Sequence, residues 1–81
     1  MERSELLIRI QEVFQDVLEN DNIILEEHMT AADIDGWTSL SQAQILTAIE
    51  QNLGIRFSLM EIMSMKSVGQ IADSVANKLD I

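Results

Sequence analysis

Residues 33–55, DIDGWTSLSQAQILTAIEQNLGI, contain signals for both ends of one helix. Thr38 and Ser39 are both good N-cap residues, and Ser39 with Gln42 three residues later has the pattern of a capping box. Gly54 can adopt the left-handed conformation that ends many helices. Between these ends, apolar side chains at helical spacing share one face: Ile45, Leu46, Ile49 and Leu53. The segment predicts a helix that begins at Ser39 or Leu40 and ends at Leu53.

The rest of the chain continues this helical pattern. Ser58 with Glu61 and Ser67 with Gln70 form two further capping boxes, which predict a short helix through about Met63 and then a last helix. One apolar stripe predicts a first helix of about four turns: Leu6, Leu7, Ile10, Val13, Phe14, Val17 and Leu18. A second stripe belongs to the last helix: Val68, Ile71, Ala72, Val75 and Leu79. With no Pro and no alternating strand pattern, the sequence predicts an all-α, four-helix bundle whose third helix is short.

A long connection, from about Ile23 to Thr38, separates the first two helices. Connections of this length are usually either functional or disordered. This one carries apolar residues that can anchor it: Ile23, Ile24, Leu25, Met29, Ile34 and Trp37. We therefore expect the connection to be pinned to the core.

Length and composition limit the class of protein. A chain of 81 residues is expected to form a single domain, residues 1–81. The absence of Cys excludes a disulfide scaffold, a thiolate metal site and a thiol nucleophile, and it fits a reducing cytoplasm. No stretch is apolar enough to cross a bilayer. We expect a cytoplasmic monomer.

The net charge of −9 is concentrated in one region. No Lys or Arg occurs between Ile10 and Ile55, and that span holds nine acids: Glu12, Asp16, Glu19, Asp21, Glu26, Glu27, Asp33, Asp35 and Glu50. This charge repels phosphate backbones and anionic lipid, so nucleic acid and membranes are poor partners. Basic protein surfaces are good partners, although the charge could also serve solubility alone.

Catalysis and metal binding find little support in the sequence. His28 is the single His and has no second metal ligand at useful spacing, and a small hydrolase built on Ser39 and His28 lacks a third group to orient it. Asp33 and Asp35 resemble the middle of a calcium loop, but this register puts Ala31 and Gln42 where carboxylates are required. We expect no catalytic residue and no metal site.

Ser39 lies where the long connection becomes a helix. The free N–H groups at a helix N-terminus favour a phosphate attached to or near such a hydroxyl. Capping of the helix is the simpler interpretation of this serine. Thr38, however, can provide the cap and leave the Ser39 hydroxyl free.

The stretch from Asp33 to Ile55, together with residues 66–71 (KSVGQI), resembles the acyl carrier proteins, and the likeness covers nearly the whole chain. This resemblance implies a 4'-phosphopantetheine arm attached to Ser39. It also implies that the arm carries acyl or aminoacyl groups as thioesters. The implied partners are a phosphopantetheinyl transferase and the enzymes that load and use the acyl groups. The chain itself would catalyse no reaction. The chain departs from the family at Thr38, where Asp is usual. It also departs in the second helix, which commonly carries several acidic residues in the family but has only Glu50 here.

Partner and cargo residues can be proposed from this resemblance and from helical geometry. Leu40 falls outside the inward arc of its helix, and the corresponding Leu of the family faces partners. Asp33, Asp35 and Glu50 would meet basic docking surfaces. A cargo cavity would be lined by adaptable Met side chains and by residues of the second helix, where small side chains leave space: Met60, Met63, Ala43 and Leu46. Filling of the core is the commoner use of Met. The alternative function is an unmodified, acidic helical module for protein–protein interaction.

Overall fold

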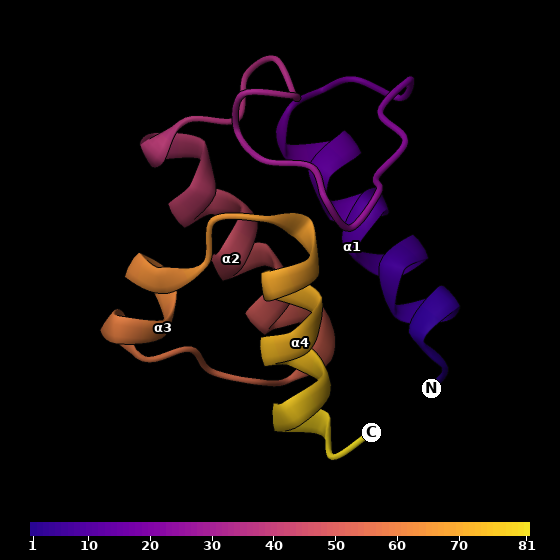
Figure 1. The fold of residues 1–81 in the computed structure, drawn as a ribbon, viewed down its shortest axis with the longest axis vertical. Helices are drawn as coiled ribbons and strands as arrows, with labels where there is room; N and C mark the ends of the chain where they lie inside the picture. Colours follow the sequence, from indigo (N-terminus) through magenta and orange to yellow (C-terminus); the bar gives the residue numbers. More distant parts are fainter.

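The computed structural model describes residues 1–81 and contains four helices and no strand. Helix α1 spans Arg3–Val17, α2 Ser39–Leu53, α3 Leu59–Ser64 and α4 Val68–Leu79 (Figure 1). Gly54 adopts a φ of +67° and ends α2, and its backbone N–H donates to the carbonyl oxygen of Glu50. The predicted all-α class and the bounds of α2 are confirmed. None of the helices is long and apolar enough to cross a membrane.

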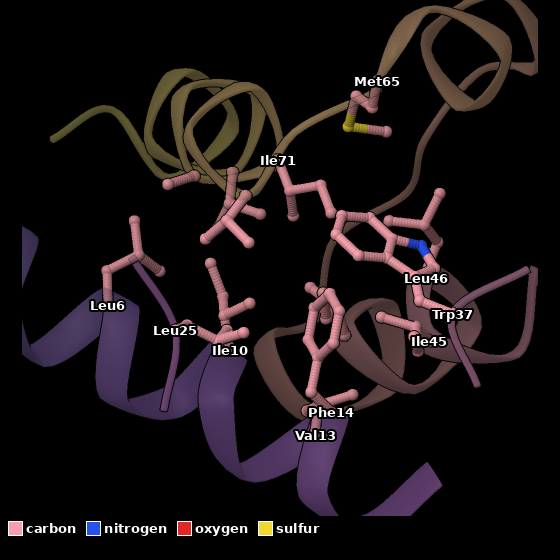
Figure 2. Close-up of a cluster of buried hydrophobic side chains, with 14 of the residues drawn as sticks. Leu6, Ile10, Val13, Phe14, Leu25, Trp37, Ile45, Leu46, Met65 and Ile71 are labelled. Atoms are coloured by element: carbon pink, nitrogen blue, oxygen red, sulfur yellow. The ribbon is translucent and has the colours of Figure 1, made fainter. Parts of the chain in front are cut away.

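The core lies between α1, α2 and α4, whose apolar stripes meet as predicted (Figure 2). Phe14 of α1 and Trp37, just before α2, stack edge to face with their ring centroids 4.9 Å apart. The short helix α3 contributes no fully buried side chain. Most of the packing energy therefore comes from the three long helices and from the connection between the first two.

The connection from Leu18 to Thr38 is pinned to this core. Ile23, Leu25, Ile34 and Trp37 are buried, as expected for anchors. Ile24 is 65% exposed, so its prediction as an anchor was wrong. Successive side chains of an extended segment point in opposite directions, and Ile24 faces solvent because both of its neighbours face the core.

The middle of the connection is tied to the start of α4. The first backbone N–H groups of a helix have no partner within it, and here the loop supplies their acceptors. Val68 donates to the carbonyl oxygen of Met29, and Gly69 to that of Glu27, each at 2.9 Å. Thr30 and Ser67 pair as an isolated antiparallel bridge. The connection is thus part of the cap of α4.

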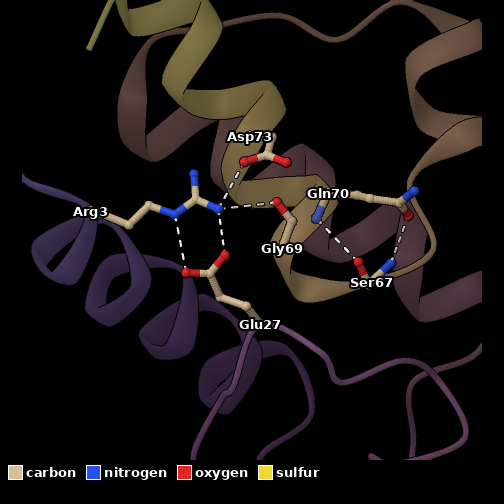
Figure 3. Close-up of polar contacts among 6 residues, drawn as sticks. All are labelled: Arg3, Glu27, Ser67, Gly69, Gln70 and Asp73. Atoms are coloured by element: carbon tan, nitrogen blue, oxygen red, sulfur yellow. Dashed lines mark hydrogen bonds and ion pairs between the residues drawn. The ribbon is translucent and has the colours of Figure 1, made fainter.

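An ion-pair cluster closes the same junction from the side of α1 (Figure 3). One guanidinium nitrogen of Arg3 lies 2.6 Å from a carboxylate oxygen of Glu27 and 2.8 Å from one of Asp73. The hydrogen bond from Arg3 holds the pKa of Glu27 below its ordinary value. Figure 3 also shows the reciprocal capping box of Ser67 and Gln70, which is confirmed, as is the box of Ser58 and Glu61. The segment leading to Ser39 is therefore fixed against both terminal helices.

Candidate functional site

The start of α2 is capped by a different pair of residues from the one predicted. The Thr38 side chain accepts from the backbone N–H of Ser41 at 3.3 Å. In return, the Ser41 hydroxyl accepts from the backbone N–H of Thr38 and donates to the carbonyl oxygen of Gly36, each at 2.7 Å. The predicted box of Ser39 and Gln42 was therefore wrong. The short side chain of Ser41 reaches both backbone groups, whereas the Gln42 amide is engaged elsewhere.

Because Thr38 is the cap, Ser39 becomes the first residue of α2, and its hydroxyl is free. The side chain is exposed and takes part in no hydrogen bond within the protein. The backbone N–H groups of Ser39 and Leu40 also find no acceptor in the chain, and the first turn of α2 contains no acid. A free hydroxyl beside two free N–H groups at the positive end of a helix is a suitable place for a phosphate ester.

A pocket of about 360 Å³ opens beside this hydroxyl, between α2 and α3; we call it the Ser39 pocket. Its apolar wall comes from Trp37, Ile62, Met63 and Met65, of which Trp37 and Met65 are each only 4% exposed. Lys66 stands at its edge and forms no ion pair. A second pocket, between α1 and α2, is lined by the later part of α2 and does not include Ser39. The hollow that adjoins the free hydroxyl is the one that can receive a group attached there.

The structure does not bring the four predicted cargo residues together. Met63 lines the Ser39 pocket, whereas Leu46 is packed in the core at 1% exposure. Met60 is 81% exposed because α3 is a six-residue helix that buries no side chain. Ala43 is exposed too, and it lines a separate depression on the outer side of α2. Trp37, Gln42 and Met65 line the pocket instead. No spacing rule in the sequence could have indicated this set, because its members meet only through the fold.

The predicted partner residues differ in their exposure and in whether their side chains already form hydrogen bonds within the protein. Leu40 is 75% exposed, in agreement with its position outside the inward arc. Glu50 is half-buried, and its carboxylate accepts from the backbone N–H of Phe57 at 2.8 Å. The Asp33 carboxylate accepts from the backbone N–H of Thr30 at 2.9 Å. The Asp35 side chain is exposed and makes no hydrogen bond or ion pair, so it is the free acid of the three.

The chain contains no cluster of three or more His, Cys, Asp or Glu side chains that could hold a metal ion. His28 is exposed and is not hydrogen-bonded to Ser39. What the site provides is an accessible hydroxyl, an anion-favouring helix terminus and an adjacent pocket.

Comparison with known proteins agrees with this geometry. The family model described as the phosphopantetheine attachment site matches residues 9–75. The chain belongs to this family of acyl carrier proteins. It is thus a carrier rather than an enzyme, and its cofactor is covalently attached 4'-phosphopantetheine. This result favours the carrier over both the small hydrolase and the unmodified interaction module.

One solved structure supports the same assignment, and two more distant ones share the fold. The holo acyl carrier protein of Geobacter metallireducens is 36% identical with a TM-score of 0.86, over 93% of this chain and 86% of that one. An acyl carrier protein of Thermotoga maritima shares the fold at 24% identity, with a TM-score of 0.87 over 99% of this chain and 93% of that one. A type-II acyl carrier protein of Streptomyces verticillus involved in bleomycin biosynthesis, at 21% identity, has a TM-score of 0.74 over 95% and 89%. A comparison with curated proteins gave no match.

Proposed function

We propose that Ser39 carries the 4'-phosphopantetheine arm, and that the chain presents acyl or aminoacyl groups held on this arm to partner enzymes. The observation that carries the proposal is the free hydroxyl of Ser39, which Thr38 and Ser41 release from capping. When attached, the arm supplies the thiol that bears the cargo as a thioester. The protein contributes a fixed position for the arm, a pocket beside it and a surface for recognition.

The groups around Ser39 suit a phosphodiester. The N–H groups of Ser39 and Leu40 have no acceptor in the chain, and their positive ends would attract an anion at this helix terminus. The unpaired ammonium of Lys66 lines the same pocket and adds positive charge. Thr38 in place of the usual Asp removes one negative charge next to the phosphate. The chain therefore has donors and a cation for the phosphate and no carboxylate in the first turn to repel it.

Intact mass tests the attachment. After incubation with coenzyme A and a broad-specificity phosphopantetheinyl transferase, the wild-type chain should gain the mass of one phosphopantetheine. Ser39→Ala should gain none. Thr47→Ala, which removes an exposed hydroxyl farther along α2, is the matched control and should be modified like wild type. An adduct that persists in Ser39→Ala would place the arm on another residue and end the proposal.

Docking is proposed to use Leu40 and Asp35, which flank Ser39 in the sequence and are both exposed. Acyl carrier proteins interact with transferases and biosynthetic enzymes, and a basic surface on such a partner would be attracted by the free carboxylate. Asp33 and Glu50 were candidates too, but their carboxylates already serve the chain's own backbone.

Association kinetics with the transferase can rank these residues. Asp35→Asn together with Glu26→Gln, both exposed and unpaired acids, should lower the association rate constant and reduce its dependence on salt. Glu50→Gln is the control, because its carboxylate is already turned toward the backbone of Phe57. If Glu50→Gln slows association more than the double variant at Asp35 and Glu26 does, these two acids serve solubility and not docking.

A further inference from the structure

The side chain of Gln42 links the two most buried residues of the Ser39 pocket. The indole N–H of Trp37 donates to Gln42 Oε1 at 2.6 Å. Gln42 Nε2 in turn donates to the backbone carbonyl oxygen of Met65 at 2.8 Å. One amide therefore spans from the loop that precedes α2 to the connection between α3 and α4. We call this pair of hydrogen bonds the Gln42 strap.

The core begins directly behind the Gln42 strap. Leu46 lies one helical turn farther along α2 on the same side as Gln42, and it is 1% exposed. Ile71 of α4 is fully buried, and Figure 2 shows Trp37, Met65 and Ile71 facing one cluster. Trp37 and Met65 both line the Ser39 pocket, and we expect an alkyl chain that continued from the pocket toward Leu46 to enter between them. The strap joins these two residues.

Opening the strap leaves polar groups without partners. An alkyl chain has no donor or acceptor, so it cannot replace Gln42 for the Trp37 N–H or for the Met65 carbonyl. Burial of an unpaired polar group is unfavourable, and Trp37 and Met65 are almost completely buried. A cargo that stays within the Ser39 pocket leaves both hydrogen bonds intact. A polar cargo can also pair with the second amide proton of Gln42 or with the ammonium of Lys66.

We propose that Gln42 is a specificity-determining residue that limits how deeply cargo enters the protein, so that the chain favours short or polar acyl groups over long alkyl chains. This inference rests on the proposed attachment at Ser39. It differs from the sequence-based expectation in both residues and direction. That expectation surrounded the cargo with Met side chains that repack easily. The Gln42 strap is instead a pair of hydrogen bonds that resists the entry of an alkyl chain.

The test compares two cargoes on three proteins. Wild type, Gln42→Met and Gln44→Met are loaded with acetyl or octanoyl arms from the corresponding acyl-coenzyme A, and complete loading is verified by intact mass. Methionine at position 42 keeps the length of the side chain but makes neither hydrogen bond. Gln44→Met adds the same side chain at an exposed position of α2 and is the matched control. Trp37 is the single Trp, so its fluorescence emission reports on the strap directly.

In wild type and Gln44→Met, the octanoyl and acetyl forms should have the same thermal midpoint and the same Trp37 emission. In Gln42→Met, the octanoyl form should melt several degrees above the acetyl form, and its emission should shift, because the chain now enters beside Trp37. Each comparison is made within one protein, so a general loss of stability in a variant cancels. Gln42→Glu is a second variant that still accepts from Trp37 but cannot donate to Met65, and its octanoyl effect should be intermediate.

The inference is overturned if octanoyl stabilises wild type as much as it stabilises Gln42→Met. It is equally overturned if octanoyl changes neither protein, since the strap would then not be what keeps the chain out. These outcomes are distinct from failure at Ser39. A chain that takes up no acyl arm by mass refutes the attachment, whereas a fully loaded chain without the expected difference refutes only the role of Gln42.

Discussion

Three hydroxyl residues at the start of α2 should contribute very differently to stability, although they are near neighbours. Ser41 is 8% exposed, and its hydroxyl makes two hydrogen bonds of 2.7 Å to backbone groups. A typical intramolecular hydrogen bond adds about 1 kcal/mol, so Ser41→Ala should lower the free energy of unfolding by about 2 kcal/mol. For a domain of this size, that corresponds to a fall of roughly 10 °C in the thermal midpoint.

The other two substitutions should cost less. Thr38 accepts one long hydrogen bond of 3.3 Å, and loss of this cap should cost about 1 kcal/mol or less. The Ser39 hydroxyl contacts no partner, and Ala is the better helix former. Ser39→Ala should therefore change stability by no more than about 0.5 kcal/mol. The expected order of destabilisation is Ser41→Ala, then Thr38→Ala, then Ser39→Ala.

Urea denaturation followed by Trp37 fluorescence and by far-ultraviolet circular dichroism measures all three variants in one assay. Coincident transitions from the two probes justify a two-state free energy. If Ser39→Ala proves as destabilising as Ser41→Ala, the Ser39 hydroxyl is a cap, and the reasoning that leaves it free for modification is refuted. A neutral Ser39→Ala also ensures that its lack of an adduct cannot be attributed to unfolding.

Two further predictions concern the junctions of α4. Gly69→Ala would place a Cβ 3.0 Å from the carbonyl oxygen of Glu27, so it should destabilise the protein despite the better helix propensity of Ala. Hydrogen exchange at the Val68 amide should become faster. A more stable variant with unchanged exchange would show that the loop can move aside at no cost. The hydrogen bond from Lys78, followed by that from the backbone N–H of Ser58, lowers the pKa of Glu61 from 4.5 to about 2. A carboxyl group with a lowered pKa contributes stability above pH 4.5, and this contribution is lost as the pH falls toward 2. The urea midpoints of wild type and Glu61→Gln should therefore differ at neutral pH and converge between pH 4.5 and pH 2. A difference that stays constant down to pH 2 would contradict this role of Glu61.

Helical elements were predictable from the sequence because their signals are local. Apolar spacing placed the buried faces of α1, α2 and α4, and Gly54 fixed the end of α2. The register of one cap was not predictable in this way. Thr38 with Ser41 and Ser39 with Gln42 are both plausible boxes, and the choice depends on Gln42, whose amide is held by Trp37 and Met65. That competition is tertiary and leaves no trace in a window of a few residues.

The exposed positions of Ser39 and Leu40 were predictable from the sequence, but the pocket beside them was not. The helix start and the helical period place these two residues directly, and both are exposed. The Ser39 pocket combines residues from a loop, α2, α3 and the connection to α4, so no spacing rule reaches it. Met60 was misjudged for the same reason. Its residue type fits a cavity wall, but the placement of α3 leaves it in solvent.

The bridge between the loop and α4 also has a consequence for biosynthesis of the chain. The carbonyl groups of Glu27 and Met29 find their partners only at Gly69 and Val68, about forty residues later in the sequence. On the ribosome, Ser39 emerges well before the segment that fixes its approach. We therefore expect a nascent chain halted before α4 to expose Ser39 on a loose loop, and the modifying enzyme to meet a well-formed substrate only once α4 has been synthesised. The fold thereby links the readiness of the proposed attachment site at Ser39 to the synthesis of α4.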